Sequence, residues 1–328
     1  MEDRKPSEEF SLVQVAEGIH VWLAPNGSWG MSNAGLILGV GESMIVDTMF
    51  DLNLTRSMLN AMATIEPRIS KSVDALLNTH ANGDHCHGNE LVPTERVIAS
   101  EETANEMDEL PPAVLFAMVE RFKGDSSALG QYIRHAFGAF DFSNITMRLP
   151  TETFTNEMSL TIGNVEVELY EVGPAHTRGD VIAYIPSRGV VFTGDILFNH
   201  ETPIMWSGPV DNWIAACELI ASFDAITIPG HGPVTDSTGA IEMRDYWVML
   251  RDQTKERFDG GMSVLDAARD IDLGPYAGWG GPERVFLNVN SLYREFGSTR
   301  AIEDVMDLFA EMGAIWVAGN GLPADQSN

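Results

Sequence analysis

The chain has 328 residues, enough for about two domains and at least one large core. Hydrophobic residues make up 44% and charged residues 21%, which excludes disordered, collagen-like and low-complexity proteins. The formal net charge is −28, from 48 acidic against 20 basic side chains. Such an acidic protein repels phosphate backbones and anionic lipids, so we expect neither nucleic acid nor a membrane as a partner.

The apolar runs, the start of the chain and the number of cysteines indicate where in the cell the protein is expected. No apolar run approaches the roughly 18 residues of a membrane-spanning helix, and the acidic start of the chain has no secretory signal pattern. The two cysteines, Cys86 and Cys217, are too few for a disulfide framework. Cytoplasmic localisation is therefore the expectation from sequence.

Strand patterns alternate with turns over the first hundred residues. A helix is expected over 52–65, where apolar residues recur at helical spacing. Short apolar runs bounded by turn residues predict five strands: 19–24, 34–39, 43–48, 73–78 and 96–100. The second and third of these strands are expected to form a hairpin around Val40-Gly-Glu. A helix with an acidic first turn is expected from Glu101.

Residues 106–142 interrupt this pattern and are predicted to form a helical insertion. Leu110-Pro-Pro opens one helix that continues to about 122, and a second covers 129–137. The insertion either packs as plain core or forms a lid over a site. Its aromatic side chains are candidates for an apolar substrate wall: Phe116, Phe122, Phe137 and Phe140.

Strands return in the second half and then give way to helices. The strands are expected at 160–162, 165–170, 181–185, 190–192 and 225–228, with a helix over 213–223. Three further helices are expected at 241–258, 264–269 and 301–312. We interpret 1–238 as a catalytic α/β domain and 239–328 as a helical extension packed on it. Trp247, Leu250 and Phe258 could dock on the body, form a homodimer contact or cover the mouth of a site.

Four histidines and two aspartates follow predicted strands and form a candidate metal site. His80, Asp84 and His85 lie within one loop after the strand at 73–78. His176 and Asp195 follow later strands, and His231 lies in Pro229-Gly-His-Gly-Pro. Imidazole nitrogens and carboxylate oxygens are ligands of zinc and similar divalent ions, and ligand sites in α/β proteins gather beyond strand ends.

This set resembles the metallo-β-lactamase superfamily of binuclear metal hydrolases, over about residues 15 to 235. The family motif His-x-His-x-Asp-His is represented by His80-x-Asn82-x-Asp84-His85, and the family's later ligands match His176, Asp195 and His231. The resemblance implies a four-layer αββα sandwich with metals at one edge. It also implies that His80, residue 82, His176 and Asp195 hold one metal, while Asp84, His85, His231 and Asp195 hold the other. Asp47 matches a position in the family that supports the ligands.

Asn82 departs from the family motif, which has a histidine there. Asn82 could ligate weakly or through water, or only the second site could fill, so one or two zinc ions per chain are expected, with iron or manganese as alternatives. His87 could compensate as a ligand or orient one from behind. Asp180, His200 and Trp206 are further candidates for contact with ligands or substrate. Cys86 is expected to have a structural role.

The resemblance predicts hydrolysis by a metal-activated water. A bound divalent ion lowers the pKa of its water to about 7, and the resulting hydroxide would attack a carbonyl that the metal polarises. Asp84 and Asp195 are the expected catalytic residues, because either could orient that hydroxide. The expected substrate is a small, largely apolar ester, lactone, thioester or amide. The alternatives are a mononuclear iron oxygenase like the persulfide dioxygenases, and a non-catalytic sensor on the same fold.

Overall fold

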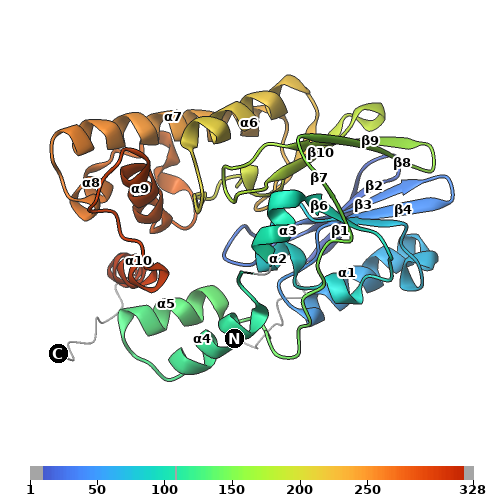
Figure 1. The fold of residues 1–328 in the computed structure, drawn as a ribbon, viewed down its shortest axis with the longest axis horizontal. Helices are drawn as coiled ribbons and strands as arrows, with labels where there is room; N and C mark the ends of the chain where they lie inside the picture. Colours follow the sequence, from blue (N-terminus) through green and yellow to red (C-terminus); the bar gives the residue numbers. More distant parts are fainter. Residues whose placement is uncertain (1–9, 108, 321–328) are drawn as a thin grey trace.

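The computed structural model describes residues 10–107 and 109–320, which form two mixed sheets with helices around them (Figure 1). The first sheet has the strand order β1-β2-β3-β4-β5-β6-β7. Its strands are β1 (Ser11–Ala16), β2 (Ile19–Leu23), β3 (Ala34–Gly39), β4 (Glu42–Val46), β5 (Ala75–Leu77), β6 (Val97–Ser100) and β7 (Glu152–Phe154). The first four strands pair antiparallel, and β4 to β7 pair parallel.

The second sheet has the order β12-β11-β10-β9-β8. Its strands are β8 (Glu157–Ile162), β9 (Val165–Glu171), β10 (Val181–Ile185), β11 (Val190–Phe192) and β12 (Ile226–Ile228). Only the β11–β12 pair is parallel. Alternate residues of both sheets, such as Ile37 and Met44 on one side and Val167 and Ile162 on the other, share one buried apolar cluster. The two sheets therefore pack face to face through a common core, as in the αββα sandwich expected from sequence.

The helices cover the outer faces of the sheets and continue the chain after β12. They are α1 (Leu52–Ile65), α2 (Gly83–Cys86), α3 (Glu101–Met107), α4 (Pro112–Phe122), α5 (Ala128–Phe137), α6 (Val210–Ser222), α7 (Ser237–Asp259), α8 (Val264–Asp270), α9 (Arg284–Glu295) and α10 (Val305–Gly319). Figure 1 shows α6 and α7 on one outer side and α1 on the other. The structure confirms a mixed α/β body with a helical C-terminal part.

The predicted helical insertion comprises α4 and α5, and α10 from the far end of the chain packs against α5 (Figure 1). Most aromatic residues of the insertion do not form the apolar substrate wall that was expected of them. Phe122, Phe137 and Phe140 are buried in the core, where Phe140 packs on Phe50 with ring centroids 4.9 Å apart. Phe116 is 43% exposed. The helical spacing that predicted α4 and α5 therefore reflects packing against the body and α10.

The helical tail docks on the body through a pair of buried indoles. Trp247 on α7 and Trp213 on α6 are fully buried, and their ring centroids are 4.5 Å apart. Leu250 is also fully buried, whereas Phe258 packs against Tyr293 further along the tail. Docking accounts for Trp247 and Leu250 without a second protomer, and the homodimer stays a prediction.

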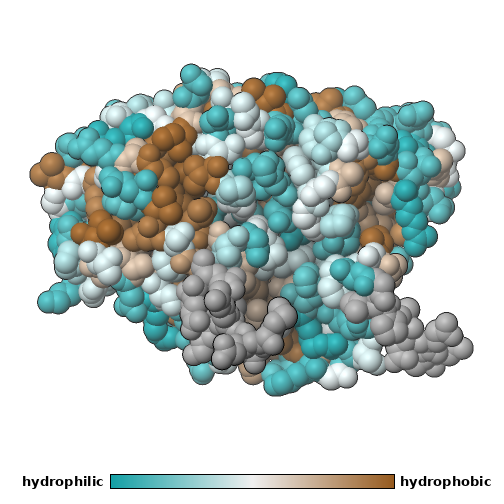
Figure 2. All heavy atoms as spheres, turned by 180° about the vertical axis from the view of Figure 1, so that it is seen from behind, coloured by the Kyte–Doolittle hydropathy of each residue, from teal (hydrophilic) through white to brown (hydrophobic). Residues whose placement is uncertain are grey.

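The face of the molecule opposite to that of Figure 1 is largely hydrophilic (Figure 2). Figure 2 shows one face of the molecule, on which hydrophilic side chains predominate and apolar side chains gather mainly in one area on the left. None of the helices in the described part of the chain combines the length and apolar character needed to cross a bilayer.

Candidate metal centre

The predicted ligands all lie in segments that follow strands, and Asp84 and His85 lie on the short helix α2. Asp47 follows β4, and the His80–His85 segment follows β5, its parallel neighbour in the first sheet. Asp195 follows β11 and His231 follows β12, its parallel neighbour in the second sheet. Because the carboxyl ends of parallel neighbours meet at one sheet edge, and the two sheets face each other, these loops converge.

Asp195 lies at the centre of the cluster of imidazoles. Its Oδ2 is 3.3 Å from Nε2 of His176 and 3.4 Å from Nε2 of His231. The same oxygen is 3.7 Å from Nε2 of His80, and Oδ1 is 3.1 Å from Nε2 of His85. One carboxylate thus approaches all four histidines, which is the geometry needed of a group shared between two metal positions.

Asp84 extends the cluster on the side of His231. Its Oδ2 is 3.2 Å from Nε2 of His231 and 3.9 Å from Nε2 of His85. Ligand atoms of Asp84, His85 and His231 lie within 4.8 Å of one another, as do those of His80, His85 and Asp195. The structure therefore brings together the complete ligand set that sequence assigned to the second metal position.

Asp47 fixes the orientation of two of the imidazoles. Its carboxylate accepts hydrogen bonds from the backbone N–H and Oγ1 of Thr79, both at 2.7 Å, and from Nδ1 of His85 at 2.9 Å. Oγ1 of Thr79 is in turn 3.0 Å from Nδ1 of His80. With a proton on each Nδ1, His80 and His85 present the Nε2 lone pair to the cluster. Asp47 has a φ of 63°, a rare backbone conformation that points to a local functional constraint.

His176 is fixed in the same tautomer by the loop after Asp195. Its Nδ1 is 2.6 Å from the carbonyl oxygen of Ile204, an acceptor, so Nδ1 carries the proton and Nε2 has a lone pair. The backbone N–H of Trp206 donates to the carbonyl oxygen of His176 at 3.1 Å. The structure gives the backbone of Trp206 this bracing role, and contact of its half-buried side chain with substrate stays a prediction.

Asn82 faces His176 directly. Its Nδ2 is 2.9 Å from Nε2 of His176. Because that nitrogen is an acceptor in the tautomer set by Ile204, the amide of Asn82 donates to it. Asn82 precedes α2 without making a capping hydrogen bond, so the side chain is free for this contact. Asn82, which stands where the family motif has a histidine, therefore donates a hydrogen bond to the Nε2 lone pair of His176 that would otherwise bind a metal.

Buried atoms without partners test whether a metal suits these residues. Among the described residues, Nε2 of His80, Nε2 of His85 and Oδ1 of Asp195 are buried and have no hydrogen-bond partner. His85 and Asp195 approach to 3.1 Å without hydrogen-bond geometry, as expected for lone pairs directed at a shared third point. Buried polar groups are rarely left unpaired, and nitrogen and carboxylate donors suit zinc. The residues present fit a divalent cation.

The electrostatics keep the carboxylates ionised. Burial raises the pKa of Asp195, but the neighbouring histidines His231, His85 and His80 outweigh it and hold that pKa well below its usual value. Burial acts the same way on Asp84, where His85 and the hydrogen bond from His231 lower the pKa to about 2. Burial also lowers the pKa of His80 well below its usual value, which keeps this ring neutral. At two other rings the carboxylates of Asp195 and Asp84 outweigh burial, raising the pKa of His85 well above its usual value and that of His231 to about 9, so both rings must release a proton before they bind a metal.

The remaining candidates lie around the cluster rather than in it. His87 is buried beside Phe50, with Nδ1 3.3 Å from the carbonyl oxygen of Phe50, and burial lowers its pKa to about 4. Asp180 accepts hydrogen bonds from the backbone and Oγ1 of Thr177, and so shapes the loop that carries His176. His200 is exposed, and no contact of its ring with the ligands is recorded in the described part of the chain.

Two further residues position the ligands and were not singled out from sequence. Oγ of Ser32 donates to the backbone carbonyl of Asp84 at 2.6 Å. The amide of Asn33 donates to the carbonyl oxygens of Pro229 and Gly232, on both sides of His231, at 2.9 and 2.8 Å. Gly230 is needed here because a Cβ on it would collide with Oδ1 of Asp195. Nothing in the local pattern around Ser32 and Asn33 indicates these long-range contacts.

Two curated proteins are similar to this chain over about two thirds of its length. The chain is 24% identical over 222 residues to a protein of Bacillus sp. (strain 170) named metallo-beta-lactamase type 2, covering 64% of this chain and 70% of that protein. It is 22% identical over 225 residues to the protein of the same name from Bacillus cereus, covering 66% and 74%.

Solved structures share the fold at low identity. A sec-alkylsulfatase, Pisa1 from Pseudomonas sp., matches 88% of this chain with a TM-score of 0.66 and 16% identity. This chain covers 50% of the length of that protein. A metallo-beta-lactamase from Pontibacter korlensis matches 73% of this chain and 99% of its own, with a TM-score of 0.54 and 17% identity. Residues 27–232 match the sequence profile of the Metallo-beta-lactamase superfamily, which is more than half of the chain. This chain belongs to the metallo-beta-lactamase superfamily.

Proposed function

We propose that this protein is a metal-dependent hydrolase that cleaves an ester, lactone, thioester or amide bond in a small, largely apolar substrate. The observation that carries the proposal is the set of buried donors around Asp195, three of which lack a partner among the described residues. A bound divalent ion supplies an acidic water at neutral pH and polarises the scissile carbonyl. His80, Asp84, His85, His176, Asp195 and His231 would hold it, and the amide of Asn82 would have to leave Nε2 of His176 for that ring to bind.

The two catalytic carboxylates have different environments. The side chain of Asp84 is 12% exposed and that of Asp195 is 3% exposed. Asp84 is therefore better placed to reach a substrate and an attacking water, and its Oδ2 is the atom that would accept the proton. Asp195 contacts four imidazoles and holds the cluster together. Zinc is the metal this donor set favours, because imidazole and carboxylate are its usual ligands with water.

The choice of substrate rests on charge. The chain carries a net charge of −28, which disfavours strongly anionic substrates and nucleic acids. A substrate panel should include a carboxylic ester, a lactone, a thioester and a small amide. A β-lactam and a secondary alkyl sulfate belong in the same panel because proteins similar to this chain are named for those activities.

The test combines metal content with turnover. Elemental analysis of the protein, before and after zinc loading, should find one or two zinc ions per chain, and the loaded enzyme should hydrolyse a carbonyl substrate. Asp195→Asn should abolish both, whereas Asp245→Asn, an exposed carboxylate on α7, should change neither. Iron together with oxygen uptake would favour the oxygenase instead. Metal binding without turnover of any substrate would favour a sensor, and no metal after loading would refute the proposal.

A further inference from the structure

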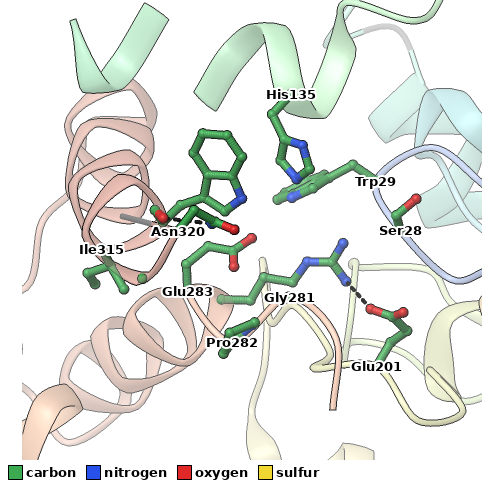
Figure 3. Close-up of a pocket in the computed structure, with 12 residues that line it drawn as sticks. Ser28, Trp29, His135, Glu201, Gly281, Pro282, Glu283, Ile315 and Asn320 are labelled. Atoms are coloured by element: carbon green, nitrogen blue, oxygen red, sulfur yellow. Dashed lines mark hydrogen bonds and ion pairs between the residues drawn. The ribbon is translucent and has the colours of Figure 1, made fainter. Parts of the chain in front are cut away.

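A second pocket, which none of the metal ligands lines, lies where five distant parts of the chain meet. It has a volume of about 330 Å³ and is lined by the loop after β2, by α5, by Glu201 in the segment before α6, by the start of α9 and by the end of α10 (Figure 3). This volume is at the lower end of the range for small-molecule sites. The hydrolase proposal does not use this pocket.

A buried carboxylate faces this pocket. Glu283 is only 3% exposed, and its Oε1 accepts a hydrogen bond of 3.0 Å from the hydroxyl of Tyr132. That hydroxyl in turn accepts from Nε1 of Trp29 at 3.1 Å, so its proton is committed to Glu283. Among the described residues, no partner is recorded for the second carboxylate oxygen of Glu283. Figure 3 shows Glu283, His135 and Trp29 facing one another across the pocket.

The positive charge at the pocket is already engaged. The guanidinium of Arg284 stacks on Trp29, 4.8 Å from the ring centroid, and donates to the carbonyl oxygen of Thr202 at 3.1 Å. It also lies 4.0 Å from a carboxylate oxygen of Glu201. Its Nε is buried without a partner and is covered by Gly281, where an added Cβ would lie 2.7 Å away. Arg284 makes one side-chain hydrogen bond among the described residues and is only 2% exposed, so its guanidinium presents little surface to an anionic ligand.

The charge balance of the lining is negative. Glu201 and Glu283 carry two negative charges against one positive charge on Arg284. Burial lowers the pKa of His135, so this histidine adds no positive charge at neutral pH. Trp316 stacks on His135 with ring centroids 4.5 Å apart and provides an aromatic wall. A carboxylate beside an aromatic wall is the environment that organic ammonium groups prefer.

We propose that the pocket between α5, α9 and α10 binds an organic ammonium compound, with Glu283 as the counter-ion of the cation and the Trp316 wall against its apolar part. The acidity of the whole chain adds to this preference, because a surface of net charge −28 attracts cations. The inference does not rest on the hydrolase proposal, and its test measures binding alone; Glu201 is the lining residue near enough to the ligand His231 for their charges to interact.

Three soluble probes that differ in charge test the proposal: 2-phenylethylammonium, 2-phenylethanol and 3-phenylpropionate. Calorimetric titration of the full chain should show binding of the ammonium probe, binding of the alcohol at least tenfold more weakly, and no binding of the carboxylate. Glu283→Gln keeps the size and the acceptor for Tyr132, and should weaken ammonium binding at least tenfold. Glu303→Gln makes the same charge change at an exposed position and should leave binding unchanged.

A second variant keeps the test decisive if Glu283→Gln does not fold. Glu201→Gln also neutralises the lining and should remove the preference for the ammonium probe over the alcohol. Circular dichroism of each variant checks folding. The proposal is overturned if the carboxylate binds more tightly than the ammonium probe, if none of the probes binds, or if ammonium binding survives in both folded variants.

Discussion

Position 82 gives the sharpest test of the metal centre. In the structure the amide of Asn82 donates to Nε2 of His176 at 2.9 Å, so a metal at His176 must first displace this hydrogen bond. Asn82→Ala removes the competing donor without adding a ligand, and Asn82→His adds an imidazole. We expect both variants to bind metal at least as tightly as the wild type, with Asn82→His the tighter.

The magnitudes follow from the cost of the hydrogen bond. A typical intramolecular hydrogen bond contributes about 0.5–1.5 kcal/mol net, and about 1.4 kcal/mol corresponds to a tenfold change in affinity. Asn82→Ala should therefore tighten metal binding at His176 by roughly twofold to tenfold. Asn82→His restores the third imidazole of the family motif, and the gain should be at least about tenfold, since even indirect ligand support changes affinity by about 10–100-fold.

Competition with a chromophoric chelator on metal-stripped protein measures these affinities, and elemental analysis gives the number of ions per chain. Asn53→Ala, an exposed asparagine on α1, is the matched control and should leave both values unchanged. A tenfold loss of affinity in Asn82→Ala would refute the reasoning, because it would show that the amide oxygen of Asn82 is a ligand.

Three further predictions concern the support of the centre and the packing of the fold. Asp47→Asn, which tolerates the positive φ but loses the charge that orients His85, should weaken metal binding about 10–100-fold in chelator competition, and an unchanged affinity would contradict the role given to Asp47. The folded pKa of His87, about 4, lies below the 6.5 of an unperturbed histidine, so the unfolded chain takes up this proton first as the pH falls. Urea unfolding of metal-stripped protein should therefore show stability lost between about pH 6.5 and pH 4, by up to about 1.4 kcal/mol per pH unit from this group, and His87→Gln should flatten that slope. Trp247→Ala removes a fully buried indole from the contact between α6 and α7 and should cost about 3–5 kcal/mol in urea unfolding, whereas a loss below about 1 kcal/mol would mean that the tail is not anchored there.

Local pattern was sufficient for most helices and strands. The helix over 52–65 coincides with α1, because its apolar spacing matches the face that it buries. The sequence pattern missed β1, β7, the short helix α2 and α9. The buried face of α9 includes Arg284, Asn288 and Asn290, which pair with the backbone of the 202–205 loop and with Ile302. Polar residues read as exposed unless their distant partners are known, and here they alternate with buried apolar residues of the same helix, so α9 was not recognised.

The amino-acid sequence by itself determined the family, the loops that carry the ligands and the identity of the donor residues, because residue type and spacing next to strands are local properties. Only the tertiary structure decided what those residues do to one another. The tautomer of His176 depends on Ile204, and the contact of Asn82 depends on His176, more than 90 positions away in the chain. Hydrogen bonds and electrostatic interactions act over a few ångströms in space, so they are fixed only when the two sheets bring their loops to a common edge.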